Sequence, residues 1–392
     1  MALGAVRVPL NAHYREVELA PILEDAEPVL VLTQSPALFP HSATAQGPGE
    51  GDPVDFWAGP DDVTALLFTS GTTGRPKGVP QTWSMWTHNL DALQARWSLT
   101  DCDALWLTLP LFHTHGLVLG LHGVLLRGAR LMLSARFDPV APPPDATHFY
   151  GVPTYYRRWL PLMQESPSAF HGLKLLVSGS DGLSAEVSDA VFGALGIRIL
   201  ERYGMTETVM ISSNPFTGDR RAGTVGTALD GTEVRLVEGE VQVRGPSVFG
   251  GYWPRPDLEA FTVDGFFRTG DAGEWDESGY LRIVGRKRDL VIVGGVNVSP
   301  AEVEAVLVRA AGVLEVGCCG LPDDDLTEVV GAAVVLAPGT SPEAALAALR
   351  EAAAGLSGLK RPRRYAIVEA LPRNALGKLQ RGRIAREVEF GG

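Results

Sequence analysis

Two kinds of hydrophobic pattern divide the chain. Up to about residue 215, short continuous apolar runs alternate with segments of helical spacing, such as Leu19, Ile22 and Leu23 within Glu18–Asp25. Continuous runs are typical of parallel strands buried on both faces, and their alternation with helices predicts a doubly wound α/β architecture. The expected strands are Val6–Leu10, Pro28–Leu32, Ala65–Thr69, Ala104–Leu109, Arg130–Leu133, His148–Gly151, Leu173–Ser178 and Ile197–Tyr203.

After Gly223 the pattern changes to alternation of apolar and polar residues. Glu233–Val237 and Glu240–Arg244 alternate on either side of Glu238-Gly239, which predicts an antiparallel hairpin. A small unit with both helices and strands follows the charged segment 285–289. Its expected elements are helices Pro300–Ala311 and Pro342–Ala354 and strands near Val313–Gly320, Val330–Leu336 and Arg364–Val368.

These patterns predict two domains. The fold class expected is α/β. Residues 1–286 form a large N-terminal domain of doubly wound sheets with a β-rich subdomain, and residues 287–392 form a small α+β C-terminal domain.

Charge and cysteine content narrow the class of protein. The 392 residues carry 34 basic and 46 acidic side chains, a net charge of −12, which argues against general nucleic-acid binding because that needs a basic surface. Three cysteines without metal-ligand spacing fit a reducing, cytoplasmic compartment. No run approaches the roughly 18 apolar residues of a membrane span. Only five of the 34 basic residues are lysine, so a lysine inside a motif favours a chemical role.

The strongest local signal follows the strand expected at Ala65–Thr69. This loop is rich in hydroxyl groups and glycine and contains one of the five lysines. Glycine lets backbone N–H groups approach an anion, hydroxyls donate hydrogen bonds, and lysine adds positive charge, so the loop predicts a phosphate site. Its glycine spacing differs from that of a Walker loop. The loop residues are Thr69, Ser70, Gly71, Thr72, Thr73, Gly74, Arg75, Pro76, Lys77 and Gly78.

Four further motifs follow this loop in order. They are Glu201-Arg-Tyr-Gly-Met-Thr-Glu207, Thr269-Gly-Asp271, Gly285-Arg286 and Leu371-Pro-Arg-Asn-Ala-Leu-Gly-Lys378. Together with the loop, they make the chain resemble the adenylate-forming acyl-CoA synthetases, AMP-binding enzymes related to luciferases and to peptide-synthetase adenylation domains. The resemblance covers essentially the whole chain. It implies an AMP-forming acid–thiol ligase that uses ATP, Mg²⁺ and CoA.

The resemblance also implies nucleotide-binding roles. Tyr203 stacks on adenine, Thr206 contacts the α-phosphate and Glu207 holds Mg²⁺. Asp271 accepts hydrogen bonds from the ribose hydroxyls, and Arg286 reaches the same sugar or phosphate. An aromatic face, a hard carboxylate and an acceptor pair suit these roles. The full ATP-binding set implied is Thr69, Ser70, Gly71, Thr72, Thr73, Gly74, Lys77, Gly179, Ser180, Glu201, Arg202, Tyr203, Gly204, Thr206, Asp271 and Arg286.

Two half-reactions are implied for the family. Lys378 bridges the substrate carboxylate and the α-phosphate during adenylation, so Lys378, Thr206 and Glu207 form the expected catalytic set. Rotation of the small domain about a hinge at Arg288, where Asp or Lys is more usual, withdraws Lys378. The same rotation presents Gly294-Gly295, whose lack of side chains leaves room for the pantetheine of CoA.

The acid to be activated is indicated by the arginines Arg157 and Arg158. On a helix their side chains diverge by about 100°, so only one faces a pocket, and a buried arginine implies an anionic partner. Resemblance to the malonyl-CoA synthetase branch assigns Arg158 to the distal carboxylate of malonate or methylmalonate. His113 and His115 lack a third metal ligand with suitable spacing. The acyl-substrate residues expected are His113, Thr114, Arg158, Ser180 and Met205.

Two other functions stay open at this point. With both arginines on the surface, the protein is a medium-chain or fatty acyl-CoA synthetase with the same mechanism. The family normally has another hairpin, helix and strand before the segment that matches Met1–Leu10, so we expect the start to be truncated; a non-catalytic nucleotide-binding relic is the second alternative. The expected partners are ATP, a carboxylic acid and CoA, with no nucleic acid and no membrane span, and the oligomeric state is left open.

Overall fold

The structure is a computed structural model that describes residues 5–11, 14, 16–32, 42–43, 59–69, 76–255, 258–373 and 379–391. The chain divides into two compact units. Unit 1 comprises Met1–Arg235, Gln242–Arg268 and Glu277–Leu281, and unit 2 comprises Leu236–Val241, Thr269–Asp276 and Arg282–Gly392. Within the described ranges no helix is long and apolar enough to cross a membrane.

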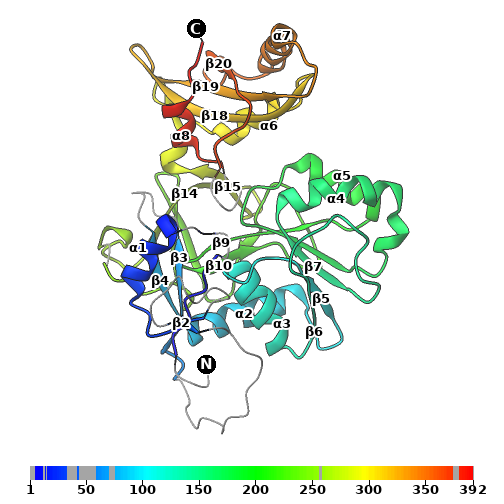
Figure 1. The fold of residues 1–392 in the computed structure, drawn as a ribbon, viewed down its shortest axis with the longest axis vertical. Helices are drawn as coiled ribbons and strands as arrows, with labels where there is room; N and C mark the ends of the chain where they lie inside the picture. Colours follow the sequence, from blue (N-terminus) through cyan, green and yellow to red (C-terminus); the bar gives the residue numbers. More distant parts are fainter. Residues whose placement is uncertain are drawn as a thin grey trace. The chain divides into compact units, whose positions relative to one another are not determined.

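Unit 1 is built around a seven-stranded sheet of order β11-β10-β9-β8-β7-β5-β6 (Figure 1). Strands β5 to β9 run parallel, and β10 and β11 are antiparallel additions at one edge. The five parallel strands are the ones that continuous apolar runs predicted, and their positions are confirmed. The strands are β5 (Ala104–Leu107), β6 (Arg130–Leu133), β7 (His148–Gly151), β8 (Leu175–Ser178), β9 (Leu200–Met205), β10 (Val209–Ser213) and β11 (Thr227–Ala228).

Each face of this sheet packs into its own hydrophobic core. Leu105 and Leu107 of β5 belong to one core and Trp106 to the other, because neighbouring strand residues point to opposite faces. Helix α2 (Trp83–Trp97) and a π-helix (His115–His122) that continues into α3 (Gly123–Leu126) pack into the first core. Helices α4 (Pro153–Glu165) and α5 (Ala185–Leu195) cover the opposite face (Figure 1). The doubly wound fold class is therefore confirmed.

The first part of unit 1 differs from expectation. The run Pro28–Leu32 contains only the two-residue strand β1 (Val31–Leu32), which pairs with β2 (Ser42–Ala43), and Val29 and Leu32 are 93% and 65% exposed. β1 does pair in parallel, but the strand is short and the prediction that it is buried is wrong, because periodicity does not reveal whether anything covers an apolar run. Of Val6–Leu10, only Arg7 forms a bridge, to Ala65. Helix α1 (Glu16–Ala26) confirms the short helix expected there.

The strand expected at Ala65–Thr69 exists, but in a different setting. β3 (Val63–Thr69) pairs antiparallel with β4 (Lys77–Thr82) in a separate two-stranded sheet. It is thus not part of the parallel sheet. The pairing places Thr69 opposite Lys77, so the glycine-rich loop joins the two strands of a hairpin.

The alternating segment forms a four-stranded sheet of order β12-β13-β14-β15. The Glu238-Gly239 turn has positive φ at both residues, as tight two-residue hairpins require, and the predicted hairpin is confirmed. The boundary of the two compact units runs through these strands. They are β12 (Glu233–Val237), β13 (Glu240–Arg244), β14 (Phe267–Trp275) and β15 (Leu281–Arg286).

The remainder of unit 2 is a five-stranded sheet with helices. β18 and β19 pair antiparallel over ten residue pairs, and β20 runs parallel to β19. The helices and strands expected here are confirmed, whereas β16, β17 and α8 were not expected. The elements are β16 (Val291–Val293), β17 (Val296–Val298), α6 (Pro300–Leu307), β18 (Val313–Asp323), β19 (Thr327–Leu336), α7 (Pro342–Ala353), β20 (Arg364–Ile367) and α8 (Arg381–Glu387).

Candidate active site

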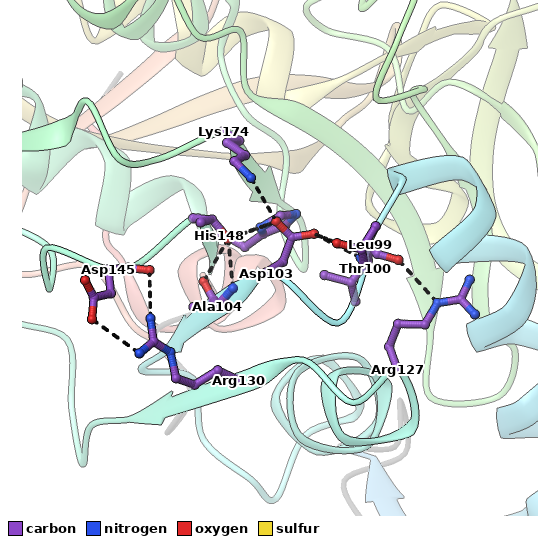
Figure 2. A network of polar contacts seen from close by, with 10 residues as sticks. Leu99, Thr100, Asp103, Ala104, Arg127, Arg130, Asp145, His148 and Lys174 are labelled. Atoms are coloured by element: carbon purple, nitrogen blue, oxygen red, sulfur yellow. Dashed lines mark hydrogen bonds and ion pairs between the residues drawn. The ribbon is translucent and has the colours of Figure 1, made fainter.

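The amino ends and the carboxyl ends of the parallel strands carry different polar groups. At the amino ends, buried Asp103 accepts hydrogen bonds from Thr100 and contacts His148 and the Lys174 ammonium (Figure 2). Burial lowers the pKa of His148 to about 4, although the neighbouring Asp103 raises it. This network joins the starts of β5, β7 and β8. Since ligands of open α/β sheets bind at the carboxyl ends, it is a structural network.

At the opposite edge, the loop after β5 leads into the π-helix. A Cβ at Gly116 would lie 2.3 Å from the Pro110 carbonyl oxygen, so only glycine allows the chain to turn this tightly. The turn places Thr114 and His115 in buried positions and His113 in a partly buried one. The His115 ring stacks on Tyr150, at the end of β7, with ring centroids 6.3 Å apart. π-helical turns are frequently found at functional sites.

Arg202, on β9, is the most unusual group at this edge. Its side chain is 4% exposed, and within the described part of the chain neither Nε nor Nη2 has a hydrogen-bond partner. Burial lowers the pKa of Arg202 to about 9. A guanidinium held without an anion in a buried position is energetically costly. Two nitrogens of the buried guanidinium are without an acceptor in the described part of the chain.

Gly179 and His115 lie near this guanidinium. A Cβ at Gly179 would lie 2.3 Å from Arg202 Cζ, so the guanidinium lies directly against the backbone after β8. Burial, and then the nearby Arg202 and His113, hold the pKa of His115 well below its usual value, so its imidazole is neutral. The Ser180 hydroxyl lies 3.4 Å from His115 Nδ1. In the described chain, the buried Ser178 hydroxyl and His115 Nε2 also lack partners.

The end of β9 and the turn to β10 hold the expected nucleotide residues. Tyr203 and Met205 are partly buried, and Thr206 and Glu207 lie in the turn. A Cβ at Gly204 would lie 2.0 Å from the Val209 carbonyl oxygen, so this tight hairpin requires glycine. The sequence motif therefore folds into one compact turn that presents Thr206 and Glu207.

Three contacts join this turn to the strand after the glycine-rich loop. The Tyr252 hydroxyl donates a hydrogen bond to Glu207 Oε1 at 2.8 Å, and Lys77 Nζ lies 4.7 Å from the centre of the Tyr252 ring. Gln81 Nε2 donates to the Thr206 carbonyl oxygen at 2.6 Å. The structure thus brings together Lys77, Thr206 and Glu207, three residues to which the family resemblance assigns ATP and Mg²⁺.

The contacts of Glu201 hold neighbouring backbone segments in place. Its side chain is buried, and Oε1 accepts a hydrogen bond from the backbone N–H of Gly223 at 2.8 Å. Burial raises the pKa of Glu201 to about 8. Its backbone carbonyl accepts from Asn214, which also binds Thr224. These contacts anchor the segment after β10.

In unit 2, Asp271 and Arg286 form an ion pair. Arg286 Nε lies 2.9 Å from Asp271 Oδ1, and Arg286 Nη1 donates to the Thr269 carbonyl oxygen at 3.0 Å. Asp271 is buried, and Gly270 between it and Thr269 has a φ of +69°. The pair thus fixes the carboxylate that the sequence assigned to ribose.

Comparison with known proteins identifies the family. Residues 1–253 match the family described as AMP-binding enzyme, and residues 302–378 match the AMP-binding enzyme C-terminal domain. This chain belongs to the AMP-binding enzyme family. The family resemblance seen in the ordered motifs is thereby confirmed.

Three members of this family show how close the similarity is. Malonate–CoA ligase of Arabidopsis thaliana is 33% identical over 98% of this chain and 74% of that protein. ATP-bound MatB from Rhodopseudomonas palustris is 35% identical, with a TM-score of 0.88 over 98% of this chain and 84% of that one. A malonyl-CoA ligase in a ternary product complex with methylmalonyl-CoA and AMP is 41% identical, with a TM-score of 0.70 over 94% of this chain and 86% of that one.

In this AMP-binding enzyme the carboxylate of Glu207 fits Mg²⁺. Mg²⁺ is usually held by one or two carboxylates together with substrate phosphates and water. Glu207 is 5% exposed and oriented by Tyr252, and Lys77 lies on the same tyrosine ring. Among the residues with a described placement, no group of three or more His, Cys, Asp or Glu could form an all-protein metal site. A single buried carboxylate beside a phosphate-loop lysine therefore suits a metal that arrives with ATP.

The remaining predicted residues lie on exposed parts of the chain or outside the residues that the structure describes. Arg157 and Arg158 are both exposed on α4, and the Arg158 guanidinium lies 5.5 Å from the centre of the Phe137 ring. Arg288 is exposed beside Asp289, and Gly294-Gly295 forms the turn between β16 and β17. Six of the predicted residues lie outside the described residues: Ser70, Gly71, Thr72, Thr73, Gly74 and Lys378.

The sequence analysis missed two residues of this site and gave a third another role. Tyr252 and Gln81 lie in no motif that was singled out, and their partners are far away in the chain. Arg202 was assigned to ATP from its place in the motif, and the burial of its guanidinium was not predicted. A basic residue inside an otherwise buried strand was the available signal.

Proposed function

We propose that this chain is an ATP-dependent, AMP-forming acid–CoA ligase whose acid is malonate or methylmalonate. The observation that carries the choice of acid is the buried Arg202, two of whose nitrogens lack partners in the described chain. A dicarboxylic acid brings one carboxylate to be activated and a second that pairs with such a cation. An aliphatic acid would leave the charge buried and unpaired, which is strongly unfavourable.

The surroundings of Arg202 support a small anionic substrate. Neutral His115 is an additional hydrogen-bonding group near the guanidinium, and the Ser180 hydroxyl lies 3.4 Å from its Nδ1. Thr114, His113 and Met205 flank the same edge of the sheet. The malonate ligases that this chain resembles support the same substrate class.

The first half-reaction forms an acyl-adenylate. One carboxylate oxygen attacks the α-phosphorus of ATP, the bond to the β-phosphate oxygen breaks, and pyrophosphate leaves. Lys77 and the glycine-rich loop bind the phosphates, and Thr206 donates to the α-phosphate. Tyr203 stacks on adenine, and backbone groups of Gly179, Ser180, Glu201, Arg202 and Gly204 frame the base, so the Arg202 side chain is left for the acid. Asp271 and Arg286 hold the ribose.

The negative charges of the reacting groups explain why adenylation needs Lys378 and Mg²⁺. Carboxylate and phosphate repel each other, and Lys378 offsets that repulsion as charge develops. Mg²⁺ bound to Glu207 and the phosphates would neutralise the leaving pyrophosphate.

The second half-reaction transfers the acyl group to CoA. The CoA thiolate attacks the acyl carbon, and AMP leaves with the electron pair of the mixed anhydride bond. We propose that residues 287–392 rotate about Arg288 between the two steps. Gly294-Gly295 then leaves room for pantetheine, because neither residue has a side chain.

The thiols support a reducing, cytoplasmic location. Cys102, Cys318 and Cys319 are all free. Burial raises the pKa of Cys319 to about 12, which keeps it as an unreactive thiol.

The test is a pyrophosphate-release panel with malonate, methylmalonate, propionate and octanoate. Wild-type enzyme is expected to prefer the two dicarboxylic acids. Arg202→Met is expected to lower kcat/KM for malonate by about 100-fold or more while sparing propionate, because only malonate loses a charged partner. Arg158→Met tests the arginine assigned from the family, and exposed Arg157→Met on the same helix is the matched control.

Each alternative has its own outcome. Loss of malonate use in Arg158→Met but not in Arg202→Met would move the carboxylate receptor to Arg158. Preference for octanoate in the wild type would support the medium-chain or fatty acyl-CoA synthetase. ATP binding without pyrophosphate release from any acid would support the non-catalytic relic.

A further inference from the structure

We propose that Tyr252 is a positioning residue that couples the phosphate-loop lysine to the carboxylate assigned to Mg²⁺. This inference rests on the adenylation step of the proposed function and not on which acid is used. Tyr252 contacts both groups with different parts of one side chain. Its hydroxyl donates to Glu207 Oε1 at 2.8 Å, and its ring faces Lys77 Nζ at 4.7 Å.

Backbone hydrogen bonds join the segment around Tyr252 to Glu207 and to Gly78, the residue after Lys77. The N–H of Phe249 donates to the Glu207 carbonyl oxygen at 2.8 Å. Trp253 and Gly78 exchange backbone hydrogen bonds of 2.8 and 3.2 Å, which places the segment beside the residue that follows Lys77. Residues 249–253 thus bridge the β9–β10 turn and the start of β4, and Tyr252 lies within that bridge.

Further contacts fix the segment from outside. Trp253 Nε1 donates to the Asp25 carbonyl oxygen at 2.8 Å, and the Asp25 carboxylate binds Arg255 at 2.7 Å. The Tyr252 ring packs edge-to-face on buried Phe249, with centroids 4.8 Å apart. The ring is therefore held by its neighbours.

The two contacts have separable consequences. The hydroxyl restricts the rotation of the Glu207 carboxylate, and partners that orient a metal-binding carboxylate typically change metal affinity by about 10–100-fold. The ring attracts the Lys77 ammonium through a cation–π interaction, which restricts where that charge lies before phosphate binds. Loss of the hydroxyl should thus affect Mg²⁺, and loss of the ring should affect ATP itself.

Two substitutions separate the contacts. Tyr252→Phe keeps the ring and removes only the hydroxyl, whereas Tyr252→Leu removes both. Tyr280→Phe is the matched control, because its hydroxyl donates to the Asp219 carbonyl oxygen at 2.8 Å on the surface. Thermal unfolding of all three variants shows whether each is folded.

The readout is equilibrium ATP binding by calorimetry, first without divalent metal and then over a Mg²⁺ titration. Tyr252→Phe is expected to bind metal-free ATP like the wild type but to need about tenfold more Mg²⁺ for the metal-dependent gain in affinity. Tyr252→Leu is expected to show this shift and, in addition, threefold to tenfold weaker binding of metal-free ATP. Tyr280→Phe should match the wild type in both.

A wild-type Mg²⁺ dependence in folded Tyr252→Phe would overturn the proposal. So would equal weakening of metal-free and Mg²⁺-dependent binding in that variant, because a merely structural role predicts it. The measurement needs no acid, so it stands even if the acid panel rejects malonate. Failure of the wild type to bind ATP would instead reject both this proposal and the proposed function.

Discussion

At the residue scale, Gly179 controls where the Arg202 guanidinium lies. A Cβ there would lie 2.3 Å from Arg202 Cζ and 2.5 Å from Nε, so Gly179→Ala must displace the guanidinium. The tip of a long side chain can move, so we expect the fold to persist and the KM for malonate to rise about tenfold, a shift of about 1.4 kcal/mol. Steady-state pyrophosphate release as a function of malonate concentration measures this change.

Gly182→Ala is the control for this prediction. A Cβ at Gly182 meets nothing within 4 Å in the described structure, and the residue lies only three positions further along the same loop. Both variants should keep a KM for ATP near that of the wild type. An unchanged KM for malonate in Gly179→Ala would contradict the placement of the acid beside Arg202.

At the element scale, the amino ends of β5, β7 and β8 depend on a neutral histidine. Burial lowers the pKa of His148 to about 4 from its ordinary 6.5, and Asp103 and Lys174 are the charged groups beside it. Between those values the unfolded chain binds the proton more readily. The contribution of neutral His148 to the free energy of unfolding is therefore fully present above pH 6.5 and is lost as the pH falls toward 4.

This shift predicts an acid sensitivity that His148→Asn removes. From pH 7 to pH 5, the wild type should lose about 2 kcal/mol of unfolding free energy more than His148→Asn does. Urea unfolding at both pH values measures the difference, and losses shared by both proteins belong to other groups, such as buried His115. An equal pH dependence in the two proteins would show that His148 does not carry the effect.

At the scale of the whole molecule, the two half-reactions are expected to depend on different residues. Lys378→Ala is expected to reduce malonate-dependent exchange between pyrophosphate and ATP by at least about 100-fold, because the repulsion of carboxylate and phosphate is no longer offset. Thioester formation from supplied malonyl-adenylate should be spared. Rapid-quench measurement of each half-reaction separates the two.

Lys360→Ala is the matched control in the same part of the chain. Lys360 pairs with Glu302 near the surface of unit 2 and has no assigned chemical role. Both half-reactions should continue in this variant. Equal loss of both half-reactions in Lys378→Ala would contradict its assigned role.

The hydrophobic pattern predicted the elements better than their surroundings. The runs in β5 to β8 are apolar enough to be recognised as buried strands, and the tight Glu238-Gly239 turn is visible from its residues. The equally apolar run Pro28–Leu32 is largely exposed, and β3 pairs in a hairpin. Local periodicity describes what a segment could bury, whereas the segments that cover it come from elsewhere in the chain.

By itself, the sequence determined the family, the ordered motifs and the central parallel sheet. These depend on residue types at short spacing, which folding does not change. Only the tertiary structure decided that Arg202 is buried without an anion while Arg158 is exposed, and that Tyr252 contacts both Lys77 and Glu207. Burial and pairing are made by residues far apart in the chain, so packing determines which of several plausible side chains faces the substrate.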